Sequence, residues 1–332
     1  MMKNNYKGII ALWVAVFLWG IHGPSARFLT LHNISLTAVA ESRFIIGTLI
    51  FFIYIIYNKI FIPLIKYFFF DILILSFFGV YLNSIFYHLG LKYIPATLVM
   101  ILENLTPFFV IFFNLIIDKI KPSKITIISL LISFSGLFLI AIGKGGLDSQ
   151  NKDFIKGFTF EIIAGITFGF YTYFTGKTIK KIKDNIHFLN IETINNENNS
   201  SNTINFKYTT ENKSNNSLNE TNIIINLLFF VFLISSILGL PLFSGYKNSK
   251  ISIVDLIVII QMGIFESGIA YILWNYGIHK TSSSKASILF LMTVVFTLIN
   301  EVIFLSFVPS FILLIGGFLI LTGSAIISLK KE

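Results

Sequence analysis

Long apolar stretches separated by short polar segments make up most of the chain. A bilayer core of roughly 30 Å is crossed by a helix of about 20 apolar residues. Stretches of this length lie at 8–28, 35–57, 67–89, 97–117, 125–143, 158–176, 223–243, 254–277, 286–307 and 310–329. They do not alternate apolar and polar residues as outer-membrane strands do. The pattern therefore predicts an all-α integral membrane protein with ten transmembrane helices.

Lysine and arginine are unevenly distributed between the connecting segments. If the N-terminus is cytoplasmic, 17 of these residues lie on the cytoplasmic side and seven on the outer side. Positive residues favour the cytoplasmic side of a membrane protein. The count therefore predicts a multi-pass protein of the cell membrane with both termini in the cytoplasm.

The composition agrees with lipid as the solvent and excludes several functions. Hydrophobic residues make up 55% of the 332 residues and charged residues only 12%, against roughly 25% in soluble domains. The chain has no cysteine, which excludes disulfides and thiol chemistry. Its net charge of +9 is scattered between apolar runs, so we expect no nucleic-acid partner. We also expect no cofactor and no metal site.

One segment, 184–221, is rich in Asn, Ser, Thr and Glu. It offers too little apolar surface to offset the entropy of ordering, which predicts disorder. The segment is either a low-complexity insert without function or a regulatory docking loop on the cytoplasmic side.

The two halves of the chain resemble each other. Residues 8–20 align with 157–169 at an offset of 149, and 87–102 align with 274–289 at an offset of 187. The insert accounts for the difference. The units are therefore 1–145 and, in two pieces, 156–183 and 222–330. Because each unit has five helices, the second enters the membrane in the opposite orientation, as in many secondary transporters.

Ionisable side chains within the predicted helices are candidates for function, because each costs roughly 2.5–3.5 kcal/mol to insert. They are Glu41, Arg43, His22, His88, Glu103, Glu161, Glu266 and Glu301. Arg43 is either a structural or gating ion pair or a site for anionic substrate, and we favour the ion pair. The excess of carboxylates disfavours multiply anionic substrates.

The helix at 97–117 carries a polar face with Glu103, Pro107 and Asn114 at helical spacing. Pro107 removes a backbone hydrogen bond, which frees the carbonyl of Glu103. Glu103 is then either a site for a cation or proton or a hydrogen-bond partner at a structural kink. The corresponding helix at 286–307 carries Thr297 and Glu301, which either line a cavity or join helices.

Aromatic and polar side chains share faces of further helices and could form the wall of a binding cavity. The alternative is ordinary packing or lipid contact. These candidates are Trp19 and His22, Asn83 and Tyr87, Tyr173, and Trp274.

Several segments together resemble the EamA family of the drug/metabolite transporter superfamily: "ALWVAVFLWGIHGPSARFL", "ESRFIIGTLIFF", "GLKYIPATLVMILENLTPFFVIFFNLI", "SLLISFSGLFLIAIG" and "AYILWNYGIHKTSSSKASIL". The resemblance implies two EamA units in tandem and a carrier of small organic metabolites, often an exporter. It also implies a cavity among the first, third, fourth, sixth, eighth and ninth helices. Pro107 matches the family pattern, whereas Val294 stands where a second proline is usual.

We therefore expect a secondary transporter, working by alternating access, for neutral, zwitterionic or cationic metabolites such as amino acids. Its partners would be the substrate, the lipid bilayer and a coupling ion, for which a proton is one choice. A homodimer stays open as an assembly state. The alternatives are a membrane-embedded enzyme and a sensor or scaffold protein. The chain lacks a Walker motif, which argues against ATP-driven pumping.

Overall fold

The computed structural model describes residues 2–94, 96–143, 153–197, 219–247, 249–306 and 308–330, and in these ranges the chain is helical with short connections. Nine helical spans are long and apolar enough to cross a membrane, and the shorter apolar helix Ile101–Ile117 supplies the tenth crossing in this part of the chain. The predicted fold, ten transmembrane helices in two repeats of five, is confirmed. We number the crossings in chain order.

The first repeat contains crossings one to five. Its helices are α1 (Met2–Trp19) and α2 (His22–Leu31) in crossing one; α3 (Leu36–Asn58) in crossing two; α4 (Leu64–Ile74), the π-helical segment η1 (Leu75–Leu82) and α5 (Asn83–Tyr93) in crossing three; α6 (Ala96–Glu103) and α7 (Thr106–Ile117) in crossing four; and α8 (Lys124–Gly143) in crossing five.

The second repeat contains crossings six to ten. Its helices are α9 (Phe154–Glu197) in crossing six; α10 (Glu220–Gly239) and the short helix η2 (Leu240–Tyr246) in crossing seven; α11 (Ile253–Gln261), the π-helical segment η3 (Met262–Ile269) and α12 (Ala270–Lys280) in crossing eight; α13 (Ser283–Phe290) and α14 (Met292–Leu305) in crossing nine; and α15 (Phe311–Leu329) in crossing ten.

An offset of 187 residues relates whole helical elements of crossings three and eight. It relates η1 to η3 and α5 to α12 exactly, and it also relates α6 to α13. π-helical turns within α-helices are rare and are frequently found at functional sites. Their recurrence at the same repeat position shows that the two halves share local geometry as well as helix order.

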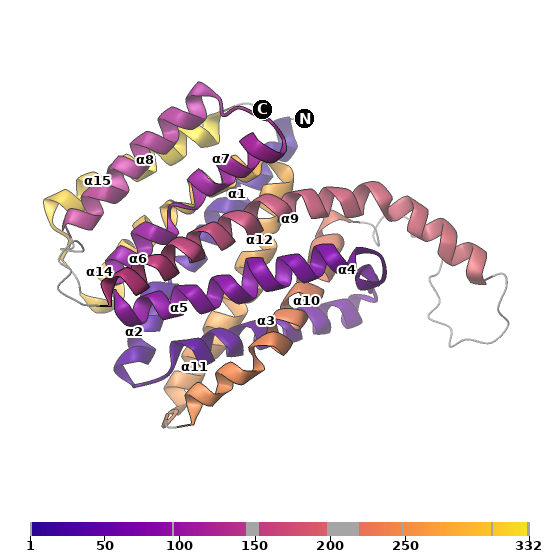
Figure 1. Ribbon diagram of the computed structural model, residues 1–332, viewed down its shortest axis with the longest axis horizontal. Helices are drawn as coiled ribbons and strands as arrows, with labels where there is room; N and C mark the ends of the chain where they lie inside the picture. The colour runs from indigo at the N-terminus through magenta and orange to yellow at the C-terminus, as the bar shows by residue number, and fades with distance from the viewer. Residues whose placement is uncertain are drawn as a thin grey trace.

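The helices form one bundle with α8 and α15 packed together at its side (Figure 1). The two peripheral helices approach closely at Gly136 and Gly316, where a Cβ on either residue would lie within 2.4–2.6 Å of the other's carbonyl oxygen. Small residues allow this contact in lipid, where the hydrophobic effect does not drive helix association.

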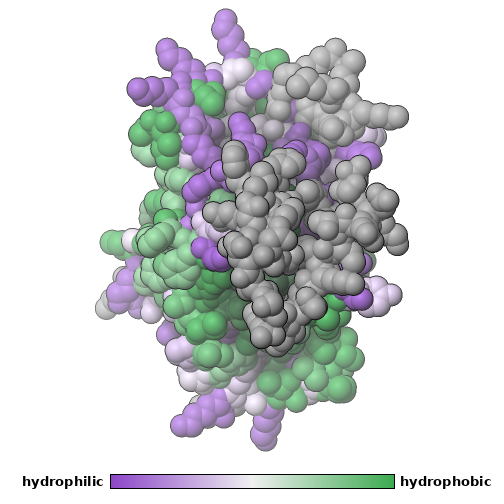
Figure 2. Space-filling model, turned by 90° about the vertical axis from the view of Figure 1, so that its right-hand side faces the viewer, coloured by the Kyte–Doolittle hydropathy of each residue, from purple (hydrophilic) through white to green (hydrophobic). Residues whose placement is uncertain are grey.

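Both termini lie at the same end of the bundle, as ten crossings require (Figure 1). At this end α9 projects beyond the other helices as far as Glu197, so it enters the segment that is expected to be disordered. Residues 198–218 of that segment lie outside the described residues. Figure 2 views this end and shows hydrophilic residues gathered there, with hydrophobic residues beside and below them.

Candidate functional site

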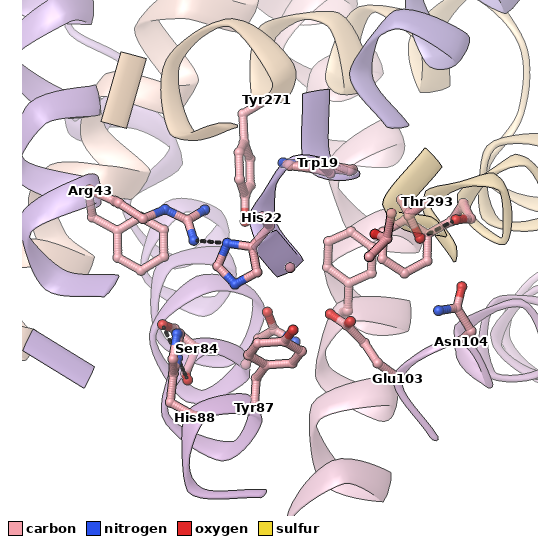
Figure 3. A pocket seen from close by; sticks show the side chains of 16 residues that line it. Trp19, His22, Arg43, Ser84, Tyr87, His88, Glu103, Asn104, Tyr271 and Thr293 are labelled. Atoms are coloured by element: carbon pink, nitrogen blue, oxygen red, sulfur yellow. Dashed lines mark hydrogen bonds between the residues drawn. The ribbon is translucent and has the colours of Figure 1, made fainter. Parts of the chain in front are cut away.

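A cavity of about 120 Å³ lies inside the bundle between the two repeats. This is several times the 10–15 Å³ that one water molecule needs, so the cavity has room for a small solute. It is lined by Trp19, His22, Gly23, Arg43, Phe44, Asn83, Ser84, Tyr87, His88, Glu103, Asn104, Phe168, Tyr271, Phe290, Thr293 and Thr297 (Figure 3). These residues come from crossings one, three, four, six, eight and nine, as the resemblance implies, and also from crossing two.

Breaks in two helices shape the cavity. Crossing one is interrupted between Trp19 and His22, and crossing four between Glu103 and Thr106. In crossing four the break precedes Pro107, which lies at the start of α7. The hydroxyl of Thr106 donates a hydrogen bond of 2.7 Å to the backbone carbonyl of Glu103. That carbonyl therefore already accepts one hydrogen bond from within the helix break.

One wall of the cavity is a charged group formed by three crossings. Arg43 Nη1 lies 2.9 Å from Nδ1 of His22, and Glu266 Oε2 lies 2.8 Å from the same nitrogen. Nδ1 can accept from Arg43 or donate to Glu266, but it cannot do both at once. Arg43 and Glu266 are also 3.4 Å apart, which is an ion pair between crossings two and eight. Glu266 lies behind the cavity wall.

The opposite wall carries Glu103. Figure 3 shows Glu103 and Arg43 on opposite sides of the cavity, with His22 and Tyr87 between them. Glu103 and Tyr87 are only partly buried, so both side chains are accessible from the cavity. The cavity thus presents a guanidinium on one side and a carboxyl on the other.

Aromatic rings close the cavity on the side of the termini. The ring of Trp19 lies 5.1 Å from Trp274, 5.3 Å from Tyr271 and 5.8 Å from Phe168, measured between centroids. Trp274 is fully buried beneath this layer and does not line the cavity. Aromatic pairs at 4.5–7 Å attract beyond their area of contact, so the layer forms a cohesive floor.

Three ion pairs hold α9 against other crossings at the end where the termini lie. Lys177 binds Asp118 at the end of α7, Lys181 Nζ lies 2.7 Å from Asp71 of α4, and Lys183 Nζ lies 2.6 Å from Glu220 of α10. Each pair joins a different crossing to α9. The lysine side chains are about half exposed, so the three pairs lie at the surface of this end.

Tyr173 and Asn114 lie at this end and do not line the cavity. Tyr173 donates a hydrogen bond of 2.7 Å to Asp118. Partial burial opposes ionisation of Asp118, but hydrogen bonds from Lys177 and Tyr173 hold the pKa of its carboxyl below the usual value. Asn114 lies within 3.4 Å of the hydroxyls at the start of α13 and joins crossings four and nine.

The candidates from the sequence are thus divided between several places. The cavity contains Trp19, His22, Arg43, Asn83, Tyr87, Glu103 and Thr297. Glu266 and Trp274 lie directly behind its walls, whereas Pro107, Asn114, Tyr173 and Glu301 lie outside it. In the described part of the chain, acidic and histidine side chains are not grouped to hold a metal ion.

Several residues that line the cavity were not predicted as site residues, although some are repeat counterparts of predicted ones. Phe168 is the repeat counterpart of Trp19, Tyr271 that of Ser84, and Phe290 that of Glu103, and all six residues line the cavity. Applying the two offsets to the candidates Trp19 and Glu103 would have found Phe168 and Phe290, whereas Tyr271 would have been missed because Ser84 was not a candidate. Nothing in the sequence marks Phe44, whose contribution depends on the packing of α3.

Comparisons with known proteins agree with this architecture. The model of the EamA-like transporter family matches residues 6–142 and 218–329, so that α9 and nearly all of the insert lie between the two matched stretches. Two relatives from Archaeoglobus fulgidus are both described as uncharacterized transporters. One is 24% identical over 78% of this chain and 76% of its own length, and the other is 23% identical over 98% and 100%.

A solved crystal structure superposes with a TM-score of 0.67 at 14% identity, covering 96% of this chain and 95% of the other. At this identity the likeness concerns the fold alone. The family match covers both repeats, and the named relatives are transporters. The chain is therefore a membrane protein of the EamA-like transporter family, within the drug/metabolite transporter superfamily.

Proposed function

We propose that the protein is a secondary transporter of small zwitterionic or cationic metabolites, with amino acids as the best fit. The observation that carries this proposal is the placement of Arg43 and Glu103 on opposite walls of one small cavity. An amino acid presents a carboxylate and an ammonium group, which these two side chains complement. Tyr87 and Trp19 supply aromatic surface for the rest of the solute.

The position of Arg43 makes it suited to a single carboxylate. Its Nε lies 3.3 Å from Ser267 Oγ, and its Nη1 approaches both His22 and Glu266. Much of its charge is therefore already offset. A multiply anionic substrate would meet Glu103 and Glu266 without enough positive charge, so we expect the protein to reject such compounds.

Alternating access is the transport mechanism that fits the inverted repeat. The aromatic floor closes the cavity on the side of the termini, and the three ion pairs of α9 lie at the surface of that end. Exchange of conformations between the two repeats would open this end and close the other. A membrane enzyme or a scaffold has no comparable need for a charged cavity between two inverted units.

Counterflow in proteoliposomes tests the proposal. Vesicles containing the purified protein are loaded with single L-amino acids or organic amines and tested for uptake of the labelled compound. We expect uptake of at least one compound, a strong loss of uptake in Glu103→Gln and Arg43→Gln, and little change in Glu41→Gln. Glu41 is a suitable control because it is a buried carboxyl outside the cavity.

The proposal is wrong if the wild-type protein exchanges only multiply anionic compounds. It is also wrong if Glu103→Gln and Arg43→Gln exchange their substrates as fast as Glu41→Gln does. The first result would contradict the substrate class, and the second would contradict the site.

A further inference from the structure

Crossing one packs against crossing eight, and in the other repeat crossing six packs against crossing three. We call these two contacts the first and the second seam. Beside each seam a ring of one crossing lies against the π-helical segment of the other: His22 against Glu266 of η3, and Tyr171 against Gly79 of η1. The repeat offsets of 149 and 187 make these two contacts counterparts of each other.

The second seam shows what packing alone requires at this position. A Cβ added to Gly79 would lie 2.7 Å from the ring of Tyr171, so the aromatic side chain fills the space left by the glycine. Tyr171 is buried, and its hydroxyl accepts a hydrogen bond of 2.8 Å from Asn275. Tyrosine and glycine carry no charge, so the fold does not need a charged group where a ring meets the π-helical segment.

The first seam has a fully buried carboxyl group at the same position. Glu266 Oε2 lies 2.8 Å from Nδ1 of His22 and 3.4 Å from Arg43, whereas its Oε1 lacks a hydrogen-bond partner among the described residues. Nη1 of Arg43 lies 2.9 Å from the same Nδ1 (Figure 3). One imidazole nitrogen is therefore placed between a guanidinium, which only donates hydrogen bonds, and a carboxylate, which only accepts them.

The two contacts of this nitrogen exclude each other as hydrogen bonds. A neutral imidazole has one nitrogen that donates and one that accepts. If Nδ1 accepts from Arg43, it has no proton to donate to Glu266. If it donates to Glu266, it has no lone pair for Arg43, and the guanidinium is released. The two arrangements differ in whether Arg43 is held at the wall or is free to bind a ligand in the cavity.

The other titratable side chains that face the His22 ring do not compete for its Nδ1. The rings of Tyr87 and His88 lie 5.7 and 6.3 Å from it, measured between centroids. Nδ1 of His88 lies 2.6 Å from the backbone carbonyl of Ser84, to which it donates. The state of His22 is therefore decided between Arg43 and Glu266.

We propose that His22 is a positioning residue that releases Arg43 to the carboxylate of the substrate. In the empty cavity Nδ1 accepts from Arg43. When a carboxylate binds the guanidinium, Nδ1 takes up a proton and donates to Glu266, while Nε2 gives its proton to water. The ring stays neutral, and the protein gains or loses no net proton.

The exchange is favourable because a bond to a neutral nitrogen is replaced by two bonds to carboxylates, which are the stronger kind. This inference rests on the proposed function and deepens it. An amine without a carboxylate cannot draw Arg43 away from His22, so the switch selects amino acids over the corresponding amines.

Solid-state NMR of nitrogen-15-labelled histidine tests the switch without substrate. The chain has five histidines, and the signals of His22 are assigned by their loss in His22→Asn. In the empty protein in lipid we expect Nδ1 of His22 to be unprotonated. In Arg43→Met and Arg43→Leu, which imitate release of the guanidinium, we expect it to be protonated. Wild type saturated with substrate should show the same change, which gives a second reading if the variants do not fold. The same tautomer in every sample would overturn the proposal.

Competition in the counterflow assay tests the selectivity. The exchanged amino acid and its decarboxylated amine compete with labelled substrate, and the ratio of their inhibition constants measures the preference for the carboxylate. His22→Phe leaves Arg43 to Glu266, so the ratio should fall about tenfold, as expected for the loss of one hydrogen bond between charged groups. His22→Asn should keep most of the preference, because its amide can turn to accept or donate.

The matched control is His32→Phe. Nδ1 of His32 also lies against a carboxylate, 2.5 Å from Asp255, but outside the cavity, so the ratio should stay unchanged. An unchanged ratio in His22→Phe, or an equal loss for both compounds, would mean that His22 only packs, and the proposal would be wrong. A wild type that exchanges no amino acid would contradict the proposed function, whereas the NMR comparison would still decide the switch.

Discussion

The two seams of the bundle have the same backbone arrangement and different chemistry. The seam between α1 and α12 places Leu12 against Gly277, and the seam between α9 and α5 places Glu161 against Gly90. In both seams, a glycine allows the two helices to approach closely. The comparison separates what the fold needs, a side chain of this size opposite a glycine, from what only the second seam has, an ionisable group beside the cavity.

The largest expected effect on stability comes from placing a carboxyl group in the seam between α1 and α12. Leu12→Glu would bury a carboxyl group without the neighbouring Glu103 or the cavity, at a cost of about 3 kcal/mol on insertion scales. We expect a clear loss of thermal stability in detergent, whereas Leu12→Met should change it little. A variant as stable as wild type would show that this seam already accommodates an acid, so that the carboxyl at Glu161 would need no special role.

A smaller effect should follow when the glycine of the first seam is replaced. Gly277→Ala places a methyl group into the leucine side chain and 3.0 Å from the carbonyl oxygen of Gly8. Overpacking of this kind costs about 1–3 kcal/mol. The thermal denaturation midpoint should therefore fall, and the double variant Gly277→Ala with Leu12→Ala should recover part of the loss. No recovery would mean that the leucine is not the clashing group.

Gly90→Ala should destabilise the protein less than Gly277→Ala does. The atoms that an added Cβ would meet belong to the Glu161 side chain and not to backbone, so a change of rotamer can relieve the clash. We therefore expect only a modest fall in the thermal denaturation midpoint. The reverse ranking of the two alanine variants in a melting experiment would contradict this account.

The smallest effect on stability is expected for Glu161→Leu, which makes the second seam like the first. Removing a buried carboxyl that lacks a hydrogen-bond partner should leave the thermal midpoint unchanged or raise it, because the cost of its burial disappears. Glu161→Ala is the matched comparison, since it leaves a cavity and should be less stable than the leucine variant. A marked destabilisation by leucine would show that the carboxyl has a structural partner.

The sequence predicts the crossings and the repeat well because both depend on long apolar runs and on residue spacing. Trp19, Tyr87 and Glu103 were identified because they are polar or aromatic groups at intramembrane positions. The position of each side chain in three dimensions is harder to predict from the sequence. Asn114 and Tyr173 have similar sequence signals, but they lie nearer the end of the bundle where the termini are, in contact with Ser284 and Asp118.

Other features depend on contacts between distant segments. The nitrogen of His22 is shared only when crossings one, two and eight meet, although His22 and Glu266 are separated by 244 positions in the sequence. The relation between Leu12 and Glu161 needs both the repeat offsets and the glycine that faces each side chain. The offsets are visible in the sequence, but the facing glycines come from the packing. The topology of the termini across the membrane stays a prediction of the charge distribution.

Accessibility of a single cysteine tests most directly whether the cavity is the transport site. The chain contains no cysteine, so Ser84→Cys introduces one thiol at a lining position with little change in size. We predict that a water-soluble thiol reagent modifies it in proteoliposomes and that a transported amino acid protects it. Ser324→Cys, fully buried between α8 and α15, should not react. A Ser84→Cys thiol that is unreactive from both sides of the membrane, or that reacts equally with and without every transported compound, would contradict the account.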